Sequence, residues 1–338
     1  MNITSNYPLN RLNTFGLDIT AKAFCEVNSE EDLAELTGSG DWKNGSKFVL
    51  GGGSNILFTQ DLNALCIHNL IQGISIVRSD DDSVWVKCGG GELWHNLVLF
   101  CVENNYGGVE NLSLIPGSTG AAPIQNIGAY GVELKETFFE LTGTHLQSGE
   151  TRTFSAADCR FGYRDSIFKR ELKNQYLISS ITLKLNRHPK FNTTYGAIEQ
   201  ELKVMNVSTL SVQQISQAVI NIRRSKLPDP AVIGNCGSFF KNPEIPEIKF
   251  LEIQNSFPDI VGYKTTPGNI KLAAGWLIEQ CGWKGKRVGN VGMHAKQALV
   301  LVNYGGATGK ELITHAQHVQ LSVKEKFDVF LEMEVNIL

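Results

Sequence analysis

The chain has 338 residues, of which 42% are hydrophobic, and it carries a formal net charge of −3 with a pI near 6.2. This length and hydrophobic content are enough to bury a sizeable core, and we expect two or three domains. The slightly acidic balance excludes the basic field of a general nucleic-acid binder, but local Arg and Lys side chains could still hold an anionic small molecule.

The N-terminal third alternates short strands with two helices. Its expected strands are short apolar or alternating runs, and they span 21–27, 48–50, 64–68, 74–77 and 84–88. The last two flank the acidic turn 80–82 and predict a hairpin. One helix begins after Ser29, the expected N-cap, with Asp32 three residues on. Apolar spacing over 92–104 predicts the second helix, which ends before Gly107.

The rest of the chain predicts strands first, and then a mixture of strands and helices. The expected strands span 138–141, 151–154, 176–185 and 329–335, and the expected helices span 270–281 and 308–326. The first three strands suggest β meanders. Composition changes at 226–230, Lys-Leu-Pro-Asp-Pro, which predicts a linker. Several small units of mixed elements favour an α+β fold over one doubly wound sheet.

The seven cysteines are odd in number, widely spaced and without a Cys-x-x-Cys pair. That pattern favours neither a disulfide framework nor a zinc site, and free thiols fit a reducing cytoplasm. Residues 1–18 lack the apolar core of a signal peptide. No apolar run approaches the roughly 20 residues of a transmembrane helix. We therefore expect a cytoplasmic protein that binds neither membrane nor nucleic acid and holds no metal.

Residues 114–131 are the stretch around which the sequence is organised, Leu-Ile-Pro-Gly-Ser-Thr-Gly-Ala-Ala-Pro-Ile-Gln-Asn-Ile-Gly-Ala-Tyr-Gly. Its four glycines and two prolines make it a poor helix and a poor strand. Small residues let the backbone approach a large ligand, and N–H groups in tight turns form an anion-binding nest. A buried glycine-rich crossover that only packs against a sheet explains the composition equally well.

A second glycine-rich turn shifts the balance toward a ligand. Residues 48–58 form an apolar strand, the turn Gly51-Gly52-Gly53-Ser54-Asn55 and another apolar run, a natural place to lodge phosphates. Neither this turn nor Gly89-Gly90-Gly91 continues as a dinucleotide-binding Gly-x-Gly-x-x-Gly, and 305–310 has the wrong spacing for a P-loop. A nucleotide fits the sequence, but not in either of those two folds.

These motifs carry a family resemblance. Asn13-Thr14-Phe15-Gly16, the 51–55 turn and the segments 115–120 and 123–131 resemble UDP-N-acetylenolpyruvoylglucosamine reductases, the flavoenzymes also called UDP-N-acetylmuramate dehydrogenases. The likeness continues to the C-terminus. It implies a two-part FAD-binding unit of the PCMH/vanillyl-alcohol-oxidase type and a C-terminal α+β substrate domain.

The resemblance also implies boundaries and flavin contacts. The implied parts are FAD-binding subdomains over 1–70 and 71–226, a substrate-binding domain over 227–327, and a C-terminal strand over 328–338 that returns to the active site. The implied FAD contacts are Gly51, Gly52, Gly53, Ser54, Asn55, Pro116, Gly117, Ser118, Thr119, Gly120, Pro123, Ile124, Gln125, Asn126, Gly128, Ala129 and Tyr130.

Residues 160–168, Arg-Phe-Gly-Tyr-Arg-Asp-Ser-Ile-Phe, pack two arginines and a tyrosine around one glycine. An ordinary surface pair of Arg164 with Asp165, worth little, is one interpretation. The apolar neighbours favour partial burial, and a partly buried Arg usually has an anionic partner. The resemblance places Tyr163 and Arg164 on the family's Tyr-Arg motif, in which the arginine contacts the substrate and the intermediate.

Residues 234–243, Gly-Asn-Cys-Gly-Ser-Phe-Phe-Lys-Asn-Pro, expose Ser238 beside two glycines. The segment is not Gly-x-Ser-x-Gly and has no convincing His/Asp partners, so nucleophilic hydrolysis is disfavoured. Ser238 could donate a proton, or it could hydrogen-bond its own backbone as turn serines often do. The match to the family's Gly-Ser-Phe-Phe-Lys-Asn-Pro segment, where the serine is the general acid, favours proton donation.

Glu332 and Glu334 lie two apart in the expected last strand, so both should face the same side. They could be a solvated strand face, or one carboxylate could orient the serine or a proton-carrying water. The resemblance assigns the catalytic glutamate to Glu334, at the second position of Leu-Glu-x-Glu-Val. Met333 departs from the family, which frequently has proline there, and the chain stops at Leu338 where the family often continues.

The resemblance implies further substrate contacts. The expected substrate-binding residues are Tyr163, Tyr195, Lys226, Asn242 and Gln297. Tyr195 resembles the mobile, substrate-covering tyrosine of one subclass of the family. Lys226 and Arg223 are candidates for the diphosphate or uridine. His315 and His318 lie in an expected helix and are interpreted as surface residues rather than ligands.

The reaction implied by the resemblance is reduction of UDP-N-acetylglucosamine enolpyruvate to UDP-N-acetylmuramate in peptidoglycan precursor synthesis. NADPH would reduce FAD and leave, and the reduced flavin would supply the hydride, because no side chain can deliver one. Arg164 would face the charge that builds toward the carboxylate, and Ser238 would protonate the adjacent carbon. We expect a monomer.

Two other interpretations stay open. An oxidase on a similar flavin fold often tethers its flavin through a histidine in the glycine-rich segment, and 105–135 contains none. A non-catalytic nucleotide-binding module would not need Arg164, Ser238 and Glu334 together.

Overall fold

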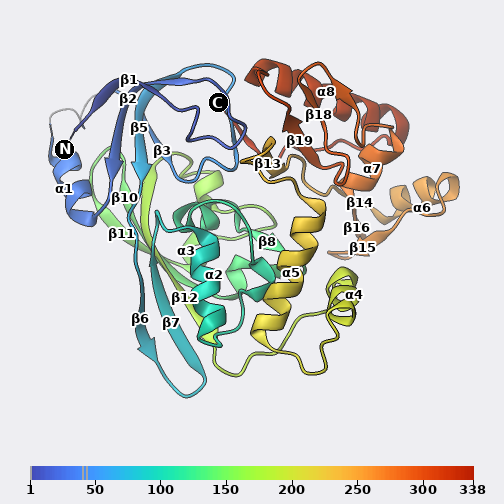
Figure 1. Ribbon diagram of the computed structural model, residues 1–338, viewed down its shortest axis with the longest axis horizontal. Helices are drawn as coiled ribbons and strands as arrows, with labels where there is room; N and C mark the ends of the chain where they lie inside the picture. The colour runs from blue at the N-terminus through green and yellow to red at the C-terminus, as the bar shows by residue number, and fades with distance from the viewer. Residues whose placement is uncertain (1, 40–41, 43–44) are drawn as a thin grey trace. The chain divides into compact units, whose positions relative to one another are not determined.

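The computed structural model describes residues 2–39, 42 and 45–338 (Figure 1). The described chain forms two compact units. Unit 1 comprises the residues up to 7 together with 20–53 and 62–225, and unit 2 comprises residues 8–19, 54–61 and 226–338. Two short N-terminal segments therefore fold with the C-terminal part of the chain.

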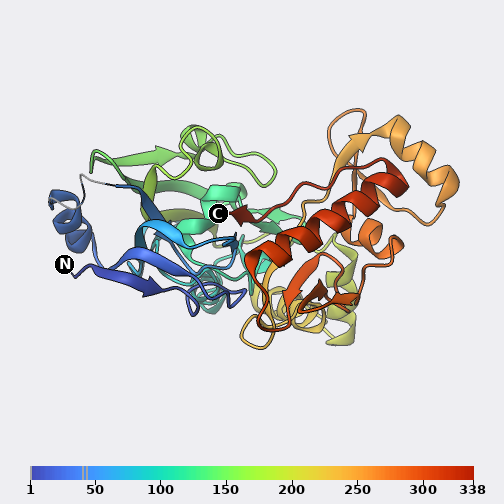
Figure 2. The same cartoon turned by 90° about the horizontal axis from the view of Figure 1, so that it is seen from above.

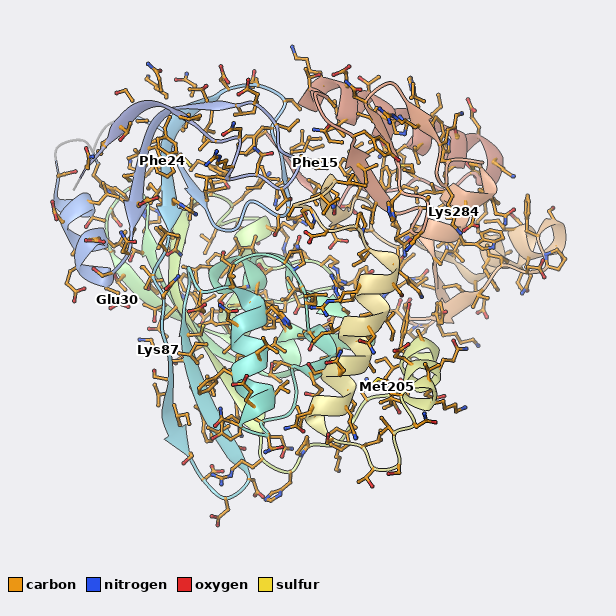
Figure 3. All side chains as sticks on the ribbon, viewed as in Figure 1. Phe15, Phe24, Glu30, Lys87, Met205 and Lys284 are labelled. Atoms are coloured by element: carbon orange, nitrogen blue, oxygen red, sulfur yellow. The ribbon has the colours of Figure 1, made fainter. Side chains whose placement is uncertain are left out.

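The first sheet of unit 1 has the strand order β1-β2-β5-β3. Its strands are β1 (Thr4–Pro8), β2 (Thr20–Val27), β5 (Leu62–Asn69) and β3 (Lys47–Leu50), with β2 and β3 both parallel to β5. Phe24 of β2, labelled in Figure 3, stacks on Tyr7 of β1 with ring centroids 3.8 Å apart. Helix α1 (Glu30–Gly38) begins as predicted, because the Ser29 hydroxyl accepts the N–H of Asp32.

The second sheet of unit 1 is antiparallel, with the order β11-β10-β12-β7-β6. Its strands are β6 (Ile74–Ser79), β7 (Ser83–Gly89), β10 (Phe138–His145), β11 (Thr151–Ser155) and β12 (Tyr176–Asn186). The predicted hairpin is confirmed as β6–β7. The expected meander is instead the hairpin β10–β11 with β12 on the other side of β10. Helix α2 (Trp94–Glu103) packs its apolar face on this sheet (Figure 1).

Short elements and two further helices complete unit 1. The short elements are η2 (Glu110–Leu112), η3 (Thr119–Gln125), β8 (Gly128–Ala129), β9 (Val132–Glu133), η4 (Leu134–Glu136), α3 (Ala156–Cys159) and η5 (Ile167–Lys169). The helices are α4 (Gly196–Val204) and α5 (Val212–Lys226), neither of which was predicted from the sequence. These helices pack on each other through Ile198 and Leu202 of α4 and Ala218, Val219 and Ile222 of α5.

Unit 2 contains two small sheets, a pair of short strands and three helices. The sheets are β13-β19-β18-β17 and β14-β16-β15, and β4 pairs with β20. The strands are β4 (Ile56–Leu57), β13 (Gly234–Ser238), β14 (Glu244–Pro246), β15 (Gly262–Lys264), β16 (Asn269–Leu272), β17 (Arg287–Val288), β18 (Val291–Met293), β19 (Val300–Asn303) and β20 (Asn336–Ile337). The helices are α6 (Glu247–Ser256), α7 (Ala274–Gln280) and α8 (Gly309–Phe327). Figure 2 shows α8 as the long helix of this unit.

Two predicted elements of unit 2 are corrected. The predicted helix 270–281 begins only at Ala274, because 269–272 form β16 between β14 and β15. The predicted strand 329–335 is irregular except for an isolated bridge at Met333, and β20 follows it at Asn336–Ile337. A strand needs a pairing partner, and this segment finds one only along residues 239–241.

His315 of α8 is buried, which corrects the prediction of a surface residue. Its side chain is 3% exposed and packs edge-on against the Trp283 ring, with centroids 5.1 Å apart. Its Nε2 has no hydrogen-bond partner within the described part of the chain. Burial, together with the nearby His318 and Lys286, lowers the pKa of His315 from 6.5 to about 4.

This shift predicts acid sensitivity. Between pH 6.5 and about 4 the unfolded chain binds a proton at His315 that the folded chain does not, so stability falls as the pH decreases through that window. From pH 7 to pH 5, we expect wild type to lose about 2 kcal/mol more unfolding free energy than His315→Leu. Urea unfolding at both pH values measures this loss. His188→Leu, at an exposed position outside α8, is the control, and equal losses in wild type and His315→Leu would contradict the prediction.

Candidate active site

Two glycine-rich turns from distant parts of the sequence lie against each other in unit 1. A Cβ on Gly51 would lie 2.1 Å from Ser118 Oγ, and one on Gly52 would lie 3.0 Å from Gly117 Cα. Glycine permits this close approach of the two backbones. Within the described residues, the N–H groups of Gly52, Gly117 and Ser118 donate to no protein acceptor. Close backbones with unused donors fit a phosphate-bearing cofactor.

The next residues of the organising stretch serve backbone packing instead. The N–H and the hydroxyl of Thr119 both donate to the Glu92 carbonyl at 2.8 Å, and the Gly120 N–H donates to the Gly90 carbonyl at 2.8 Å. A Cβ on Gly90 would lie 2.0 Å from the Ile178 carbonyl oxygen. The third glycine cluster thus lets η3 pack on the sheet, so the stretch combines both interpretations of its composition.

Asn126 is fully buried, and the protein uses both ends of its amide. Its Nδ2 donates to the Gly162 carbonyl at 2.9 Å and to Glu133 Oε2 at 3.1 Å, and its Oδ1 accepts the Lys135 N–H at 3.0 Å. These bonds connect the end of η3 to the loop that carries Tyr163 and Arg164. The amide of Asn126 therefore supports the arginine loop, and its expected flavin contact stays a prediction.

Arg164 is held at the turn that follows η3. Its guanidinium donates to the Gly128 carbonyl and lies 5.3 Å from the centroid of the Tyr163 ring. Arg164 is half-buried and has a left-handed backbone, with φ of 52°. Asp165, the possible surface partner of Arg164, pairs with Arg170 at 3.1 Å.

Leu114, at the start of the organising stretch, is held from both sides. Its backbone is left-handed, with φ of 58°, an uncommon conformation for a large side chain. Its N–H donates to His95 Nδ1 at 3.0 Å, and its carbonyl accepts Arg223 Nε at 3.2 Å. Arg223 also hydrogen-bonds the side chain of Tyr130, and burial lowers its pKa. Arg223 therefore fixes the start of the glycine-rich stretch by a hydrogen bond. The part that His95 takes in this was not predicted from the sequence.

Unit 2 brings Ser238 and Glu334 together. Ser238 ends β13 and is exposed, and the carbonyl of the next residue, Phe239, accepts the Glu334 N–H at 2.8 Å. The Glu334 carboxylate lies close enough to Cys236 to contribute, after burial, to a strongly raised pKa of that thiol. Irregular pairing rather than a regular strand therefore places the glutamate beside the serine.

The backbone at position 333, where this chain has Met333, could accommodate the proline that the family often has there. Its bridge with Phe240 uses the Lys241 N–H to the Glu332 carbonyl at 2.9 Å and the Glu334 N–H. Met333 N–H itself donates to no acceptor within the described residues, so proline would cost no hydrogen bond. The Glu332 side chain is bound by Lys241 Nζ, whereas the Glu334 carboxylate lies close enough to Cys236 to help raise the pKa of its thiol, so the two glutamates have different surroundings.

The Asn13-Thr14-Phe15-Gly16 motif supports β13. The Asn13 side chain closes its own loop by donating to the carbonyls of Leu9 and Leu17 at 2.9 and 3.0 Å. The Thr14 carbonyl accepts the Asn235 N–H at 2.9 Å. Phe15, labelled in Figure 3, packs against the Phe239 ring with centroids 6.4 Å apart. The motif therefore acts in unit 2, on the strand that presents Ser238.

The side chains of two expected substrate residues lie beside the first turn of α7. Asn242 Oδ1 accepts the Ala274 N–H at 3.0 Å, and Gln297 Oε1 lies 3.0 Å from the position of a Cβ on Gly275. Lys226 is exposed at the end of α5. Arg164, Tyr163 and Tyr195 belong to unit 1, and Lys226, Asn242 and Gln297 belong to unit 2.

Among the described residues, no group of His, Cys, Asp and Glu side chains is arranged to hold a metal ion. No helix in the described part of the chain is both long and apolar enough to cross a membrane. All seven cysteines are free thiols.

Known proteins similar to this chain identify its family. A model of the FAD binding domain matches residues 21–154, and a model of the UDP-N-acetylenolpyruvoylglucosamine reductase C-terminal domain matches residues 229–338. The UDP-N-acetylenolpyruvoylglucosamine reductases of Flavobacterium johnsoniae and Amoebophilus asiaticus are 49% and 50% identical to it, with 100% of each chain covered. The chain belongs to the UDP-N-acetylenolpyruvoylglucosamine reductase family.

The solved UDP-N-acetylenolpyruvylglucosamine reductase of Thermus caldophilus has a similar fold, with a TM-score of 0.67 at 22% identity over 99% of this chain and 98% of that chain. Together these matches confirm the predicted α+β fold, with an FAD-binding unit followed by a family-specific C-terminal domain. They also confirm an FAD-containing oxidoreductase.

If the two glycine turns hold the flavin, Gly52→Ala should weaken flavin binding. The added Cβ would press on Gly117 and displace the opposite turn. We expect about a tenfold rise in the Kd for FAD, the size of effect that modest overpacking produces. Titration of flavin-stripped protein with FAD measures it. Gly38→Ala is the control, because nothing lies within 4 Å of its Cβ position. An unchanged Kd for Gly52→Ala would contradict the assignment.

Proposed function

We propose that this enzyme uses NADPH to reduce the enolpyruvyl group of UDP-N-acetylglucosamine enolpyruvate, which gives UDP-N-acetylmuramate. The observation that carries the proposal is the full-length identity of about half with reductases named for this substrate. The protein is proposed to be monomeric and cytoplasmic, with FAD-binding subdomains over 1–70 and 71–226, a substrate-binding domain over 227–327 and a C-terminal strand over 328–338. The proposed substrate-binding residues are Tyr163, Tyr195, Lys226, Asn242 and Gln297.

The chemistry assigns a role to each catalytic side chain. With FAD bound at the glycine-rich turns, the flavin would supply the hydride for the terminal vinyl carbon. Negative charge then builds toward the substrate carboxylate, where the Arg164 guanidinium stabilises it. Ser238 donates a proton to the adjacent carbon; a serine is a weak acid, but an enolate is a strong enough base to take that proton. Glu334 orients the serine or the water that restores its proton.

Support for these roles comes from each unit separately. In unit 1 the Gly128 carbonyl holds the half-buried guanidinium of Arg164, which keeps a cation at the end of the glycine-rich stretch. In unit 2 backbone pairing puts Glu334 next to an exposed Ser238. The electrons and protons added to the double bond balance. The hydride carries two electrons and one proton and is replaced from NADPH, and the second proton comes from Ser238.

Anaerobic stopped-flow absorbance near 450 nm tests the proposal. NADPH alone should bleach the flavin, and UDP-N-acetylglucosamine enolpyruvate added afterwards should restore its colour. If oxygen restores the colour rapidly and the sugar nucleotide has no effect, the oxidase interpretation replaces this one. If NADPH does not bleach the flavin, the assigned electron donor is wrong.

A further inference from the structure

Asn111 of η2 joins three segments of unit 1 at one nitrogen. Its side chain is 1% exposed, and its Nδ2 donates to the Tyr130 carbonyl at 3.0 Å and to the Asn192 carbonyl at 2.9 Å. Both hydrogens of the amide are therefore committed to backbone oxygens. One oxygen belongs to the end of the glycine-rich stretch, and the other lies three residues before Tyr195.

Asn192 adds a second connection in the opposite direction. Its Nδ2 donates to the Gly131 carbonyl at 3.1 Å, and its Oδ1 accepts the N–H and the hydroxyl of Thr194 at 3.3 and 2.8 Å. The side chain thus closes a small turn that leads directly into Tyr195. The Tyr195 ring meets the Tyr130 ring edge-on, with centroids 5.3 Å apart.

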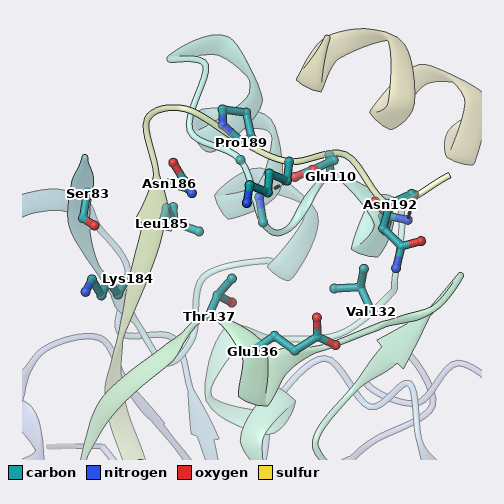
Figure 4. Close-up of a pocket in the computed structure, with 14 residues that line it drawn as sticks. Ser83, Glu110, Val132, Glu136, Thr137, Lys184, Leu185, Asn186, Pro189 and Asn192 are labelled. Atoms are coloured by element: carbon teal, nitrogen blue, oxygen red, sulfur yellow. Dashed lines mark hydrogen bonds between the residues drawn. The ribbon is translucent and has the colours of Figure 1, made fainter. Parts of the chain in front are cut away.

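The segment before Asn192 has contacts of its own: the Arg187 N–H donates to the Asp82 carbonyl at 2.9 Å, and Phe191 packs against the hydrophobic core of unit 1. Residue Asn186 pairs with Gly107, at 2.9 and 3.0 Å, and beyond it the chain borders a cavity of about 410 Å³ (Figure 4). Asn111 and Asn192 both line this cavity, together with Pro189 and Lys190. The amide side chains of Asn111 and Asn192 therefore supply hydrogen bonds that fix the chain between this cavity and Tyr195.

We propose that Asn111 and Asn192 form an amide latch that positions Tyr195 over the substrate. The latch ties the Tyr195 segment to the Tyr130 turn, and α4, packed on α5, holds the chain on the other side of Tyr195. The inference rests on the proposed function, because it assumes that Tyr195 covers the sugar nucleotide. It makes Asn111 a positioning residue, which touches neither substrate nor flavin.

The test is a variant that keeps the shape of Asn111 but removes its donors. In the flavin-loaded enzyme, Asn111→Asp places a carboxylate against two carbonyl oxygens. We expect trypsin to cleave after the exposed Lys190 at least about fivefold faster, and the KM for the sugar nucleotide to rise about tenfold, the equivalent of one to two lost hydrogen bonds. The rate of flavin reduction by NADPH is measured in parallel and should change less than the KM, because Asn111 reaches the expected flavin contact Tyr130 only through its backbone carbonyl.

Two other variants separate positioning from folding. Asn192→Ala, at a half-buried site, should reproduce the faster cleavage and the raised KM even if Asn111→Asp fails to fold. Asn69→Asp is the matched control: Asn69 is also buried in unit 1 and donates to a carbonyl at 2.9 Å, but it lies outside the latch. It should lower stability without changing cleavage after Lys190.

The cleavage assay does not depend on the reaction, so the inference and the proposed function can fail separately. Unchanged cleavage and unchanged KM in both latch variants would overturn the latch. Faster cleavage with an unchanged KM would overturn the positioning of Tyr195 over the substrate. A wild-type enzyme whose reduced flavin ignores the sugar nucleotide would overturn the proposed function itself.

Discussion

Replacing Ser238 with alanine should slow reoxidation of the reduced flavin by the sugar nucleotide by a factor of about 10² to 10⁴, the range of a positioned general acid. The alanine lacks the proton that the proposed enolate must take up, while β13 and its pairing with residues 332–334 use backbone groups and stay intact. Single-turnover absorbance with prereduced enzyme measures the rate.

The same experiment separates catalysis from binding. Flavin reduction by NADPH should be unchanged in Ser238→Ala, because no proton from the serine is needed there. Ser322→Ala, which removes a hydroxyl bonded to the His318 carbonyl in the same unit, should leave both phases unchanged. A Ser238→Ala rate within about threefold of wild type would exclude the serine as proton donor, because general acids contribute far more.

Features of the fold that depend on neighbours in the sequence could be predicted from it. The Ser29 cap and the β6–β7 hairpin are set by residues a few positions apart, and both are confirmed. Helix α5 also carried a readable signal, since Val212, Ile215, Val219 and Ile222 share one face. The start of the predicted helix at 270 was wrong because β14 and β15 pair with that segment, and local propensity does not report such partners.

The candidate site likewise has local features that the sequence predicts and long-range contacts that it does not. Glycines in a turn indicate that two backbones can approach closely, and the structure places Gly52 against Gly117. The residues that hold these segments by hydrogen bonds give no such signal. Arg223 donates to Leu114, 109 positions earlier, and Asn111 donates to Asn192, 81 positions later. His315 looked like a helix-surface residue because only the folded unit brings the Trp283 ring against it.

Replacing Arg164 with lysine should lower kcat for the sugar nucleotide by about 10² to 10³, the cost of removing one donor aimed at developing negative charge. The guanidinium is a planar fork that can donate to the Gly128 carbonyl and still present further N–H groups to a carboxylate, whereas an ammonium is a single point charge. Lysine keeps the positive charge, so a loss shows that geometry matters and not charge alone.

The control for Arg164→Lys lies in the same loop. Arg170→Lys alters an exposed arginine that pairs with Asp165, and it should leave kcat within about twofold of wild type, as exposed ion pairs contribute little. Steady-state kinetics with both substrates, and flavin bleaching by NADPH alone, distinguish the outcomes. A fall in kcat with unchanged bleaching places Arg164 at the reacting carboxylate. If only the KM rises, the arginine binds substrate and transition state equally, and the charge that develops during hydride transfer is stabilised by another group.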